Sequence, residues 1–522
     1  MQSNFSSAQN AIDLICNDDT VAFSGFVGTG ASDELIGALE AKFLETGTPA
    51  NLTLMFGAAA GDGKELGLNK LAHEGLVSRM IGGHYGLAPK LGKLAIDGKA
   101  EAYNLPLGCV SHLFRDIAAG RPGTISRVGL HTFIDPRHGG GKINDITTDD
   151  IIKLIEIDGE EWLQYKPHPI NVALIRGTTA DPNGNISMEK EALTLDTRAI
   201  AMAAKNSGGI VIAQVERLTE ANMLNPRQVQ IPGIMVDCVV VASPENHKQT
   251  YITPYSRAYA SEIRVPISSA KSMDLDERKV IARRAAIELP MNGVVNLGIG
   301  MPEGVSAIAS EEGVLDFVTL TAEPGVIGGM PSGGLDFGTA VNTDAIIQMG
   351  EQFDFYDGGG LDMACLGMAE CDAFGNVNVS RFGPKLTGAG GFINISQNAR
   401  ELILAGTFTT GGLKTQIRDA KLHIIQEGAN KKFVSKVEEI TFNGAYSVER
   451  GQVVLYVTER CVFRCRANGI ELIEVAPGID IENDILAHMD FTPIIDSPVE
   501  MDSRIFNSPP MNLSEMLKAT PE

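Results

Sequence analysis

The chain has 522 residues and a net charge of −22, from 43 Lys and Arg against 65 Asp and Glu. At ~100–200 residues per domain, this length predicts two to four domains. The negative charge disfavours nucleic acid and anionic membranes as partners, because both attract Lys and Arg. The 57 glycines make up about 11% of the 522 residues, above the typical share of ~7%, and predict many tight turns.

No basic N-terminal region followed by an apolar run is present, and no run of 18 apolar residues occurs. We therefore expect a cytoplasmic protein without a membrane span. The seven cysteines and nine histidines are scattered, without the paired spacing of a zinc site. We expect reduced thiols and no metal.

Short β-branched runs alternate with helix-length segments, which is typical of βαβ units and mainly parallel sheets. The sequence therefore predicts an α/β fold. The expected strands are 20–26, 169–177, 208–218, 293–300, 314–320 and 399–408, and the expected helices are 33–47, 195–206, 276–289 and 303–313.

Two pairs of segments indicate an internal duplication. DTVAFSGFVG (19–28) resembles NGVVNLGIGM (292–301), and residues 173–187 resemble 364–378. Matched glycines lie 273 residues apart in the first pair and 191 in the second, so the first half carries about 80 extra residues between positions 30 and 170. We predict two similar open α/β domains, 1–268 and 269–522. Chance similarity among βα units is the alternative.

Two glycine-rich turns, 25–30 and 298–304, each follow an expected strand and precede an expected helix. This context suits a phosphate at a helix N-terminus, or an ordinary structural turn. Neither turn has the G-x-G-x-x-G spacing of a dinucleotide site, which disfavours a nicotinamide-dependent dehydrogenase.

Glu323 stands at the end of the expected strand 314–320, before the sharp turn of Pro324 and Gly325. The carboxyl ends of parallel strands are where open α/β sheets bind ligands. Further on, Gly388, Gly390 and Gly391 precede an expected apolar strand. Their N–H groups could form an oxyanion hole, or the segment could be a plain hairpin.

The motifs TAEPGVIGG (321–329) and PSGGLDFG (331–338) resemble the catalytic-glutamate motif of family I coenzyme A-transferases. The similarity is to the single-chain acyl-CoA:acetate/3-ketoacid type, which includes acetate and propionate CoA-transferases. It extends over essentially the whole chain, including the segments 105–144, 231–241, 353–362, 388–396 and 489–495.

The resemblance implies transfer of coenzyme A (CoA) between a short-chain acyl-CoA and a carboxylate such as acetate, propionate, butyrate or a 3-keto acid. Glu323 would be the nucleophile, forming a mixed anhydride and then a glutamyl-CoA thioester. We expect it to have an ordinary pKa of ~4.3 and to need no base. Gly390 and Gly391 would bind the oxyanion. CoA would contact Gly298, Ile299, Gly300, Met301, Pro302 and Gly388.

The resemblance also implies CoA as substrate without a tightly bound cofactor, and a homo-oligomer, either dimer or tetramer. One residue departs from the pattern: Leu107 stands where relatives commonly carry a Gln that helps to bind the oxyanion. Leu107 is expected to make the acyl pocket more apolar, and Asn104 or a backbone N–H could replace the missing donor. Lys385, Arg381 and Lys414 are candidates for the CoA phosphates.

Two alternatives remain at this point. An acyl-CoA hydrolase on the same scaffold would let water attack the enzyme intermediate. A non-catalytic ligand-binding or regulatory protein would share the scaffold without the chemistry, because fold does not determine function.

Overall fold

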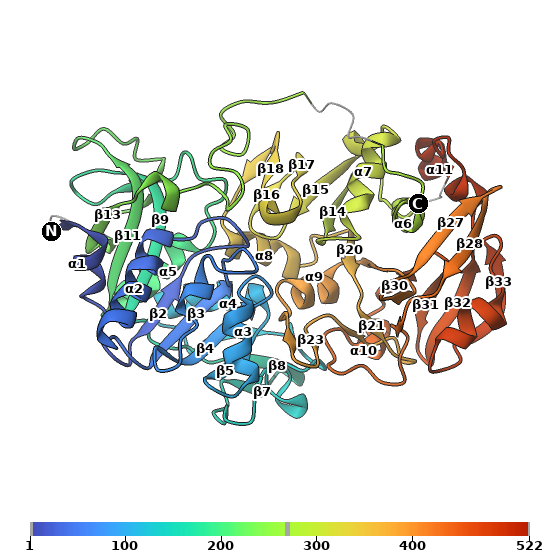
Figure 1. Ribbon diagram of the computed structural model, residues 1–522, viewed down its shortest axis with the longest axis horizontal. Coiled ribbons are helices and arrows are strands. Elements are labelled where there is room, and N and C mark those ends of the chain that lie inside the picture. The colour runs from blue at the N-terminus through green and yellow to red at the C-terminus, as the bar shows by residue number, and fades with distance from the viewer. Residues whose placement is uncertain (1–3, 267–271, 520–522) are drawn as a thin grey trace.

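The computed structural model describes residues 4–266 and 272–519. It contains two α/β halves that lie side by side along the long axis (Figure 1), each built on a ten-stranded sheet. The predicted α/β class with two similar, mainly parallel sheets is confirmed. The predicted boundary between residues 268 and 269 lies outside the described residues, so the exact division stays a prediction.

The first sheet has the strand order β1-β13-β11-β9-β2-β3-β4-β5, and these eight strands are parallel. All nine residues of β9 are buried, as expected where helices cover both faces of a parallel sheet. The strands are β1 (Asn4–Ser6), β2 (Thr20–Phe23), β3 (Leu52–Ala58), β4 (Val77–His84), β5 (Glu101–Asn104), β9 (Val172–Ala180), β11 (Ile210–Leu218) and β13 (Cys238–Val241). The short strand β10 (Ile186–Ser187) pairs antiparallel with β9, and β12 (Val229–Ile231) pairs antiparallel with β10.

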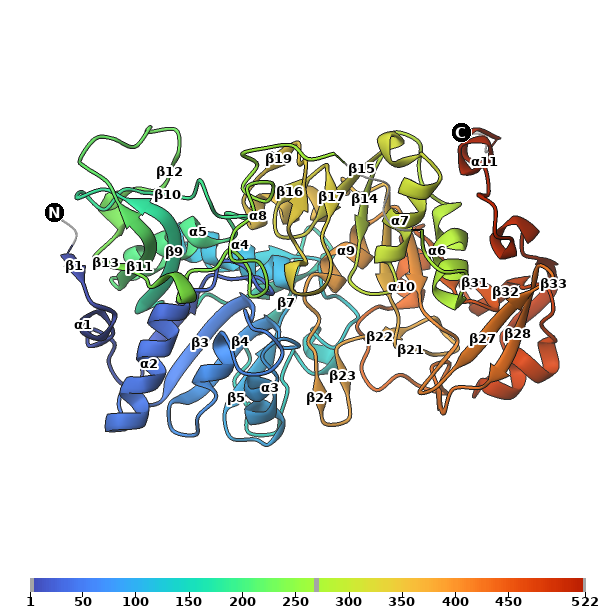
Figure 2. The same ribbon diagram turned by 45° about the horizontal axis from the view of Figure 1, so that its top comes forward.

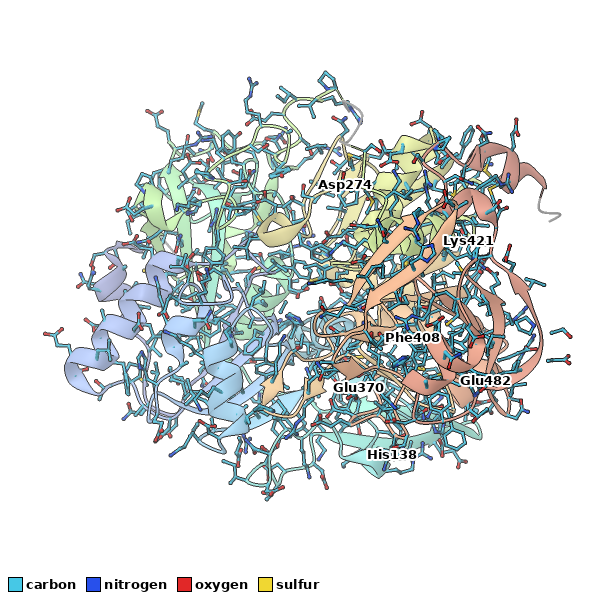
Figure 3. All side chains as sticks on the ribbon, turned by 45° about the vertical axis from the view of Figure 1, so that its right-hand side comes forward. His138, Asp274, Glu370, Phe408, Lys421 and Glu482 are labelled. Carbon is cyan, nitrogen blue, oxygen red and sulfur yellow. The ribbon has the colours of Figure 1, made fainter. Side chains whose placement is uncertain are left out.

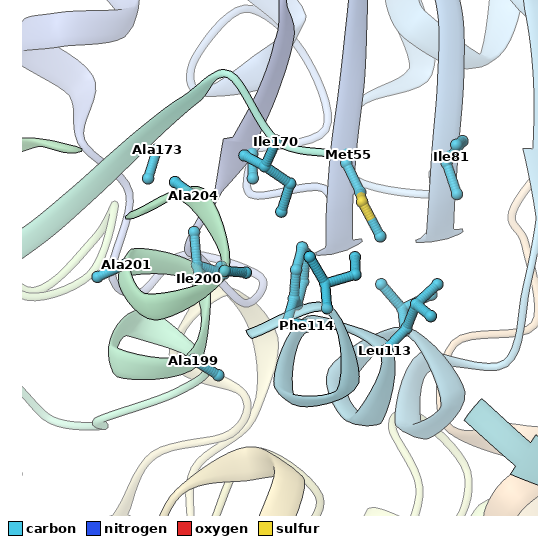
Figure 4. Close-up of a cluster of buried hydrophobic side chains, with 14 of the residues drawn as sticks. Met55, Ile81, Leu113, Phe114, Ile170, Ala173, Ala199, Ile200, Ala201 and Ala204 are labelled. Atoms are coloured by element: carbon cyan, nitrogen blue, oxygen red, sulfur yellow. The ribbon is translucent and has the colours of Figure 1, made fainter. Parts of the chain in front are cut away.

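Helices cover both faces of this sheet. One face packs against α1 (Ala8–Ile12), α2 (Asp33–Thr46) and α3 (Pro89–Ile96). The other packs against α4 (Leu107–Ala118) and α5 (Thr197–Asn206). Figure 4 shows Leu113 and Phe114 of α4 and Ile200 of α5 facing Met55 and Ile81 of the sheet.

The second sheet has the order β19-β16-β15-β14-β20-β25-β30-β31-β32-β33. Its central strands β15-β14-β20-β25-β30 are parallel and repeat the order of β3-β2-β9-β11-β13 in the first sheet. The strands are β14 (Gly293–Leu297), β15 (Val318–Ala322), β16 (Val326–Ile327), β19 (Ala345–Ile346), β20 (Met363–Gly367), β25 (Glu401–Ala405), β30 (Val453–Val457), β31 (Cys461–Arg466), β32 (Gly469–Val475) and β33 (Ile494–Glu500).

The helices of the second half separate into two groups. The helices α6 (Glu277–Ala286), α7 (Glu303–Glu311) and α11 (Leu513–Ala519) pack on the outer apolar core of this half. The helices α8 (Met349–Asp357) and α9 (Phe392–Asn398) pack in a core that also contains residues of the first half. Figure 2 shows α4, α8 and α9 near the centre of the molecule. A short helix, α10 (Gly444–Glu449), lies beside β31.

Smaller sheets complete the fold. The interval between α4 and β9 contains the three-stranded sheet β6-β8-β7. It falls within the region predicted to carry the extra residues, and that insertion stays a prediction. The small strands are β6 (Thr124–Ser126), β7 (Ile152–Ile157), β8 (Glu160–Tyr165), β17 (Met330–Pro331), β18 (Ala340–Val341), β21 (Glu370–Cys371), β22 (Val377–Asn378), β23 (Arg381–Phe382), β24 (Lys385–Leu386), β26 (Thr409–Thr410), β27 (Lys414–Arg418), β28 (Lys421–Gln426) and β29 (Asn430–Lys431).

Two local predictions are wrong. The strand expected over 314–320 begins only at Val318, after a 3₁₀ turn at Leu315–Phe317. The apolar strand expected after Gly391 is the helix α9. Its Ile and Phe residues favour a strand, but Asn394 and Gln397, one helical turn apart, both find buried hydrogen-bond partners. Tertiary contacts therefore override the local propensity.

Candidate active site

Glu323 lies where the two halves meet. It follows β15 directly and starts a turn in which Gly325 has a φ of +118°. A Cβ on Gly325 would collide with the carbonyl oxygen of Ile347, so the turn requires glycine. The residue as a whole is half-buried because a cavity opens beside it, but its Oε2 is fully buried.

Two adjoining cavities meet at Glu323. The first, the glycine lobe, has a volume of about 260 Å³ and is lined mainly by residues 296–299 and 387–392. The second, the apolar lobe, has a volume of about 430 Å³ and is lined by both halves, with most of its apolar side chains from the first half. The first half contributes Phe26, Val27, Ala58, Leu87 and Leu107, and the second half contributes Ile299, Leu335 and Phe337. The residues that line both lobes are His84, Ile299, Glu323, Phe337, Thr387 and Gly390.

The glycine turn at 388–391 is joined to the first half by backbone hydrogen bonds. Gly390 N–H donates to the carbonyl of Gly83 at 2.8 Å, and the Gly390 carbonyl accepts from Leu107 N–H at 2.9 Å. The Gly390 amide is therefore already engaged, and the structure does not support its predicted role as an oxyanion donor. Gly391 N–H faces the Glu323 carboxylate, and a Cβ on Gly391 would collide with Oε2.

The electrostatics of Glu323 differ from the sequence expectation. Burial raises the pKa of Glu323 to about 7, and the Gly391 N–H opposes this effect only in part. Oε2 makes no hydrogen bond of good geometry with the described residues, and no cation offsets the cost of burying the charge. The expected ordinary pKa is therefore wrong for this site.

The predicted CoA-binding residues divide into two sets. Gly298 and Ile299 line the glycine lobe together with Gly388, and Ile299 is 54% exposed at its mouth. Gly300, Met301 and Pro302 line neither lobe and lead from the mouth into α7. Gly300 has a φ of +87° and open space around its Cβ position.

Leu107 is fully buried in the apolar lobe, where it begins α4. Asn104, proposed as a substitute donor, is otherwise engaged. Its Nδ2 donates to the carbonyls of Gly82 and Gly83, and its Oδ1 accepts from Ala389 N–H at 2.9 Å. Asn104 therefore holds the glycine turn in place and lines neither lobe.

His84 is a site residue that the sequence reasoning missed. It is the last residue of β4 and lines both lobes. Burial lowers the pKa of His84 to about 4. Its position at the carboxyl end of an apolar strand, before a glycine-containing turn, was the available signal.

Of the predicted phosphate-binding cations, only Lys385 lines a lobe, at the exposed rim of the apolar one. Arg381 donates to the carbonyl of Ile143 at 3.0 Å. Lys414 is on the β27–β28 hairpin, which lies at the end of the molecule away from the first half (Figures 1 and 3). Within residues 4–266 and 272–519, no group of three His, Cys, Asp or Glu side chains is placed to hold a metal ion. The same residues include no helix long and apolar enough to cross a membrane.

Comparison with known proteins identifies the class of this enzyme. The model of the coenzyme A transferase family matches residues 5–242. The chain is 47% identical over 512 residues to caffeate CoA-transferase of Acetobacterium woodii, covering 97% of this chain and 98% of the relative. It is 44% identical over 503 residues to acetate CoA-transferase YdiF of Escherichia coli K12, covering 96% and 94%.

A solved structure agrees with these relatives. The acyl-CoA transferase YdiF of Escherichia coli O157:H7, solved as a thioester complex with CoA, matches with a TM-score of 0.93 at 42% identity. The match covers 98% of this chain and 97% of that one. The chain therefore belongs to the coenzyme A transferase family and is a CoA-transferase. The resemblance drawn from residues 321–338 is confirmed.

Proposed function

We propose that this enzyme transfers CoA from a short-chain acyl-CoA to a free carboxylate through covalent intermediates on Glu323. The observation that carries the proposal is the position of Glu323, the only carboxylate among the described residues that line either lobe. A nucleophile placed there can reach an acyl group in one lobe and a thioester sulfur in the other.

The transfer of CoA through Glu323 needs no external base. A Glu323 carboxylate oxygen attacks the thioester carbon, the C–S bond breaks, and CoA leaves as a thiolate. The thiolate then attacks the glutamyl carbonyl of the mixed anhydride, releasing the donor carboxylate and leaving glutamyl-CoA. The acceptor carboxylate reverses both steps and departs as the new acyl-CoA.

Burial of Glu323 has a chemical consequence in this scheme. A carboxylate deprived of water and cations is a stronger nucleophile, but it must first lose its proton. With the pKa of Glu323 near 7, kcat/KM should rise with pH up to about 7 and level off above it. A profile that is flat from pH 5 to 8 would contradict this expectation.

The lining residues support roles for the other predicted positions. We assign the oxyanion donor to Gly391 N–H, which faces Glu323, and the path for CoA to Gly298 to Pro302 and Gly388, of which Gly298, Ile299 and Gly388 line the glycine lobe. The apolar lobe holds the acyl group, with Leu107 in its wall. Its titratable side chains are His84, Glu323 and the rim residue Lys385. This lining favours monocarboxylic acyl groups over dicarboxylic ones. A cytoplasmic location and a homo-oligomeric state remain predictions.

Intact-mass spectrometry after incubation with acetyl-CoA tests the mechanism. We expect a CoA-sized adduct that hydroxylamine or borohydride removes and that maps to Glu323. Glu323→Gln should form no adduct and lose turnover by roughly 10⁴-fold, while the exposed Glu449→Gln should behave as wild type. Complete absence of an adduct with a panel of short acyl-CoAs would contradict the proposal. Rapid turnover without any acceptor carboxylate would instead indicate a hydrolase.

A further inference from the structure

The side chain of His84 has no assigned role, although it is central to the site. Of the six residues that line both lobes, only His84, Glu323 and Thr387 carry polar side-chain atoms. No hydrogen bond joins either His84 ring nitrogen to the described residues. A polar ring that faces a cavity without a protein partner is available to a ligand.

The ring position is set by two glycines. A Cβ on Gly86 would lie 2.8 Å from Cε1 of His84, and a Cβ on Gly390 would lie 3.5 Å from its Cδ2. The imidazole is therefore held between these two backbones, with little room to rotate. Because Gly391 contacts Glu323 and Gly390 contacts His84, the nucleophile and the imidazole flank one turn. Both side chains line the two lobes, so both face the space in which an acyl group would bind.

Of the other donors in the region, the Thr387 hydroxyl also lines both lobes, and the donors nearest the glycine turn are engaged or absent. Gly390 N–H donates to Gly83, the amide of Asn104 donates to Gly82 and Gly83, and Leu107 has no polar side-chain atom. Among the backbone and side-chain donors of the glycine turn named here, Gly391 N–H is then left to face the charge that develops on the acyl oxygen, with His84 and Thr387 as the side chains that can add a second donor. Oxyanion sites usually combine more than one positioned donor.

The protonation state of His84 suits a hydrogen-bond donor rather than an acid. Its pKa, lowered by burial, leaves the ring neutral at pH 7, with one N–H donor and one acceptor nitrogen. The other titratable groups that line the lobes are Glu323 and the exposed Lys385. A neutral donor can stabilise an oxyanion without adding a fixed charge to an apolar pocket.

We propose that His84 is a catalytic residue that donates its N–H to the acyl carbonyl oxygen while Glu323 attacks the carbonyl carbon. No proton is transferred in this step. The hydrogen bond strengthens as the oxygen gains negative charge, and it relaxes when the C–S bond breaks and the carbonyl re-forms. The inference rests on the covalent mechanism proposed above.

Three variants test this role. His84→Leu and His84→Phe both remove the N–H donor and differ in side-chain shape. His84→Gln keeps an N–H donor in its side-chain amide. We expect both donor-free variants to lose kcat by about 10²–10³-fold with a change in KM below about threefold, and His84→Gln to recover about tenfold of that loss. The exposed His138, labelled in Figure 3, provides the control substitutions His138→Leu and His138→Gln. Thermal unfolding identifies which variants keep the fold.

Several outcomes would overturn the inference. One is a kcat within about threefold of wild type in any folded donor-free variant. Another is a loss of kcat in Thr387→Val without a loss in the His84 variants, which would assign the hydrogen-bond donor to Thr387. A pH–rate limb near pH 4, separate from that of Glu323, that disappears in His84→Gln would show that the imidazole transfers a proton instead.

The rate of adduct formation separates this inference from the proposed function. Wild type that forms no Glu323 adduct would refute the covalent mechanism itself. Wild type that forms it, with donor-free His84 variants forming it equally fast in a single turnover, would refute only the role of His84.

Discussion

The two halves place the same strand–glycine turn–helix unit in opposite environments. In the first half, the turn after β2 is covered by protein: a Cβ on Gly28 would lie 2.5 Å from the carbonyl oxygen of Leu335 and 3.2 Å from the amide nitrogen of Tyr251. In the second half, the turn after β14 is open, and nothing lies within 4 Å of the Cβ position of Gly300. A repeated motif has therefore become a packing contact on one side and an entrance on the other.

β3 and β15 hold corresponding places in the two sheets, and the residues at their carboxyl ends also differ between the halves. β3 ends at Ala58, which lines the apolar lobe, whereas β15 is followed by Glu323. The first half supplies most of the apolar wall of the second lobe and His84, and the second half supplies Glu323 and most of the glycine lobe. Duplication provides two equivalent carboxyl strand ends. The site lies between them, where the end of β15 carries the Glu323 carboxylate and the end of β3 contributes to an apolar wall.

The largest effect on the free energy of unfolding should come from removing the carboxylate of Glu323, which follows β15. The pKa of Glu323 is about 7 in the folded protein, above its ordinary ~4.3, so the folded state retains a proton that the unfolded state loses between these values. Stability therefore falls as pH rises through this window. At ~1.36 kcal/mol per pH unit, the penalty above pH 7 reaches about 4 kcal/mol.

Glu323→Gln should thus be more stable than wild type at pH 8, with the difference disappearing near pH 4. Urea denaturation at several pH values measures this effect, and Glu449→Gln is the matched control because its side chain is exposed. Equal gains at pH 4 and pH 8 would show that the charge is not responsible.

The two glycine turns should respond differently to alanine. Gly28→Ala should lower the free energy of unfolding by about 1–3 kcal/mol, since the new methyl group has no space. Gly300→Ala meets no atom, and its positive φ costs only about 1 kcal/mol. Its main effect should be a higher KM for acyl-CoA. Thermal unfolding and steady-state kinetics of both variants test the difference, and a larger KM change in Gly28→Ala would reverse the assignment of the open turn.

The smallest effect should be a change of acyl preference at Leu107. Leu107→Gln places an amide in the wall of the apolar lobe, so kcat/KM for butyryl-CoA should fall about tenfold relative to acetyl-CoA. Leu107→Met, which keeps the volume and the apolar character, should preserve the ratio. If both variants change the ratio equally, shape rather than polarity sets the preference.

Much of the fold could be predicted from the sequence because it depends on local patterns. The alternation of short apolar runs with helix-length segments predicted the parallel strands, and the repeated segments around Gly25 and Gly298 indicated two related halves. The helix α9 could not be predicted, since Asn394 and Gln397 find their buried partners only in the assembled protein. The engagement of the Gly390 amide and the open state of the second glycine turn also depend on contacts between the halves.

The sequence by itself determined the α/β class, the duplication and the family, and it singled out Glu323 as the candidate nucleophile, because strand periodicity and a contiguous motif are properties of neighbouring residues. Only the tertiary structure decided the pKa of Glu323, the place of His84 and which backbone amides are available. These depend on burial and on which groups from distant segments satisfy one another, and a linear pattern contains neither.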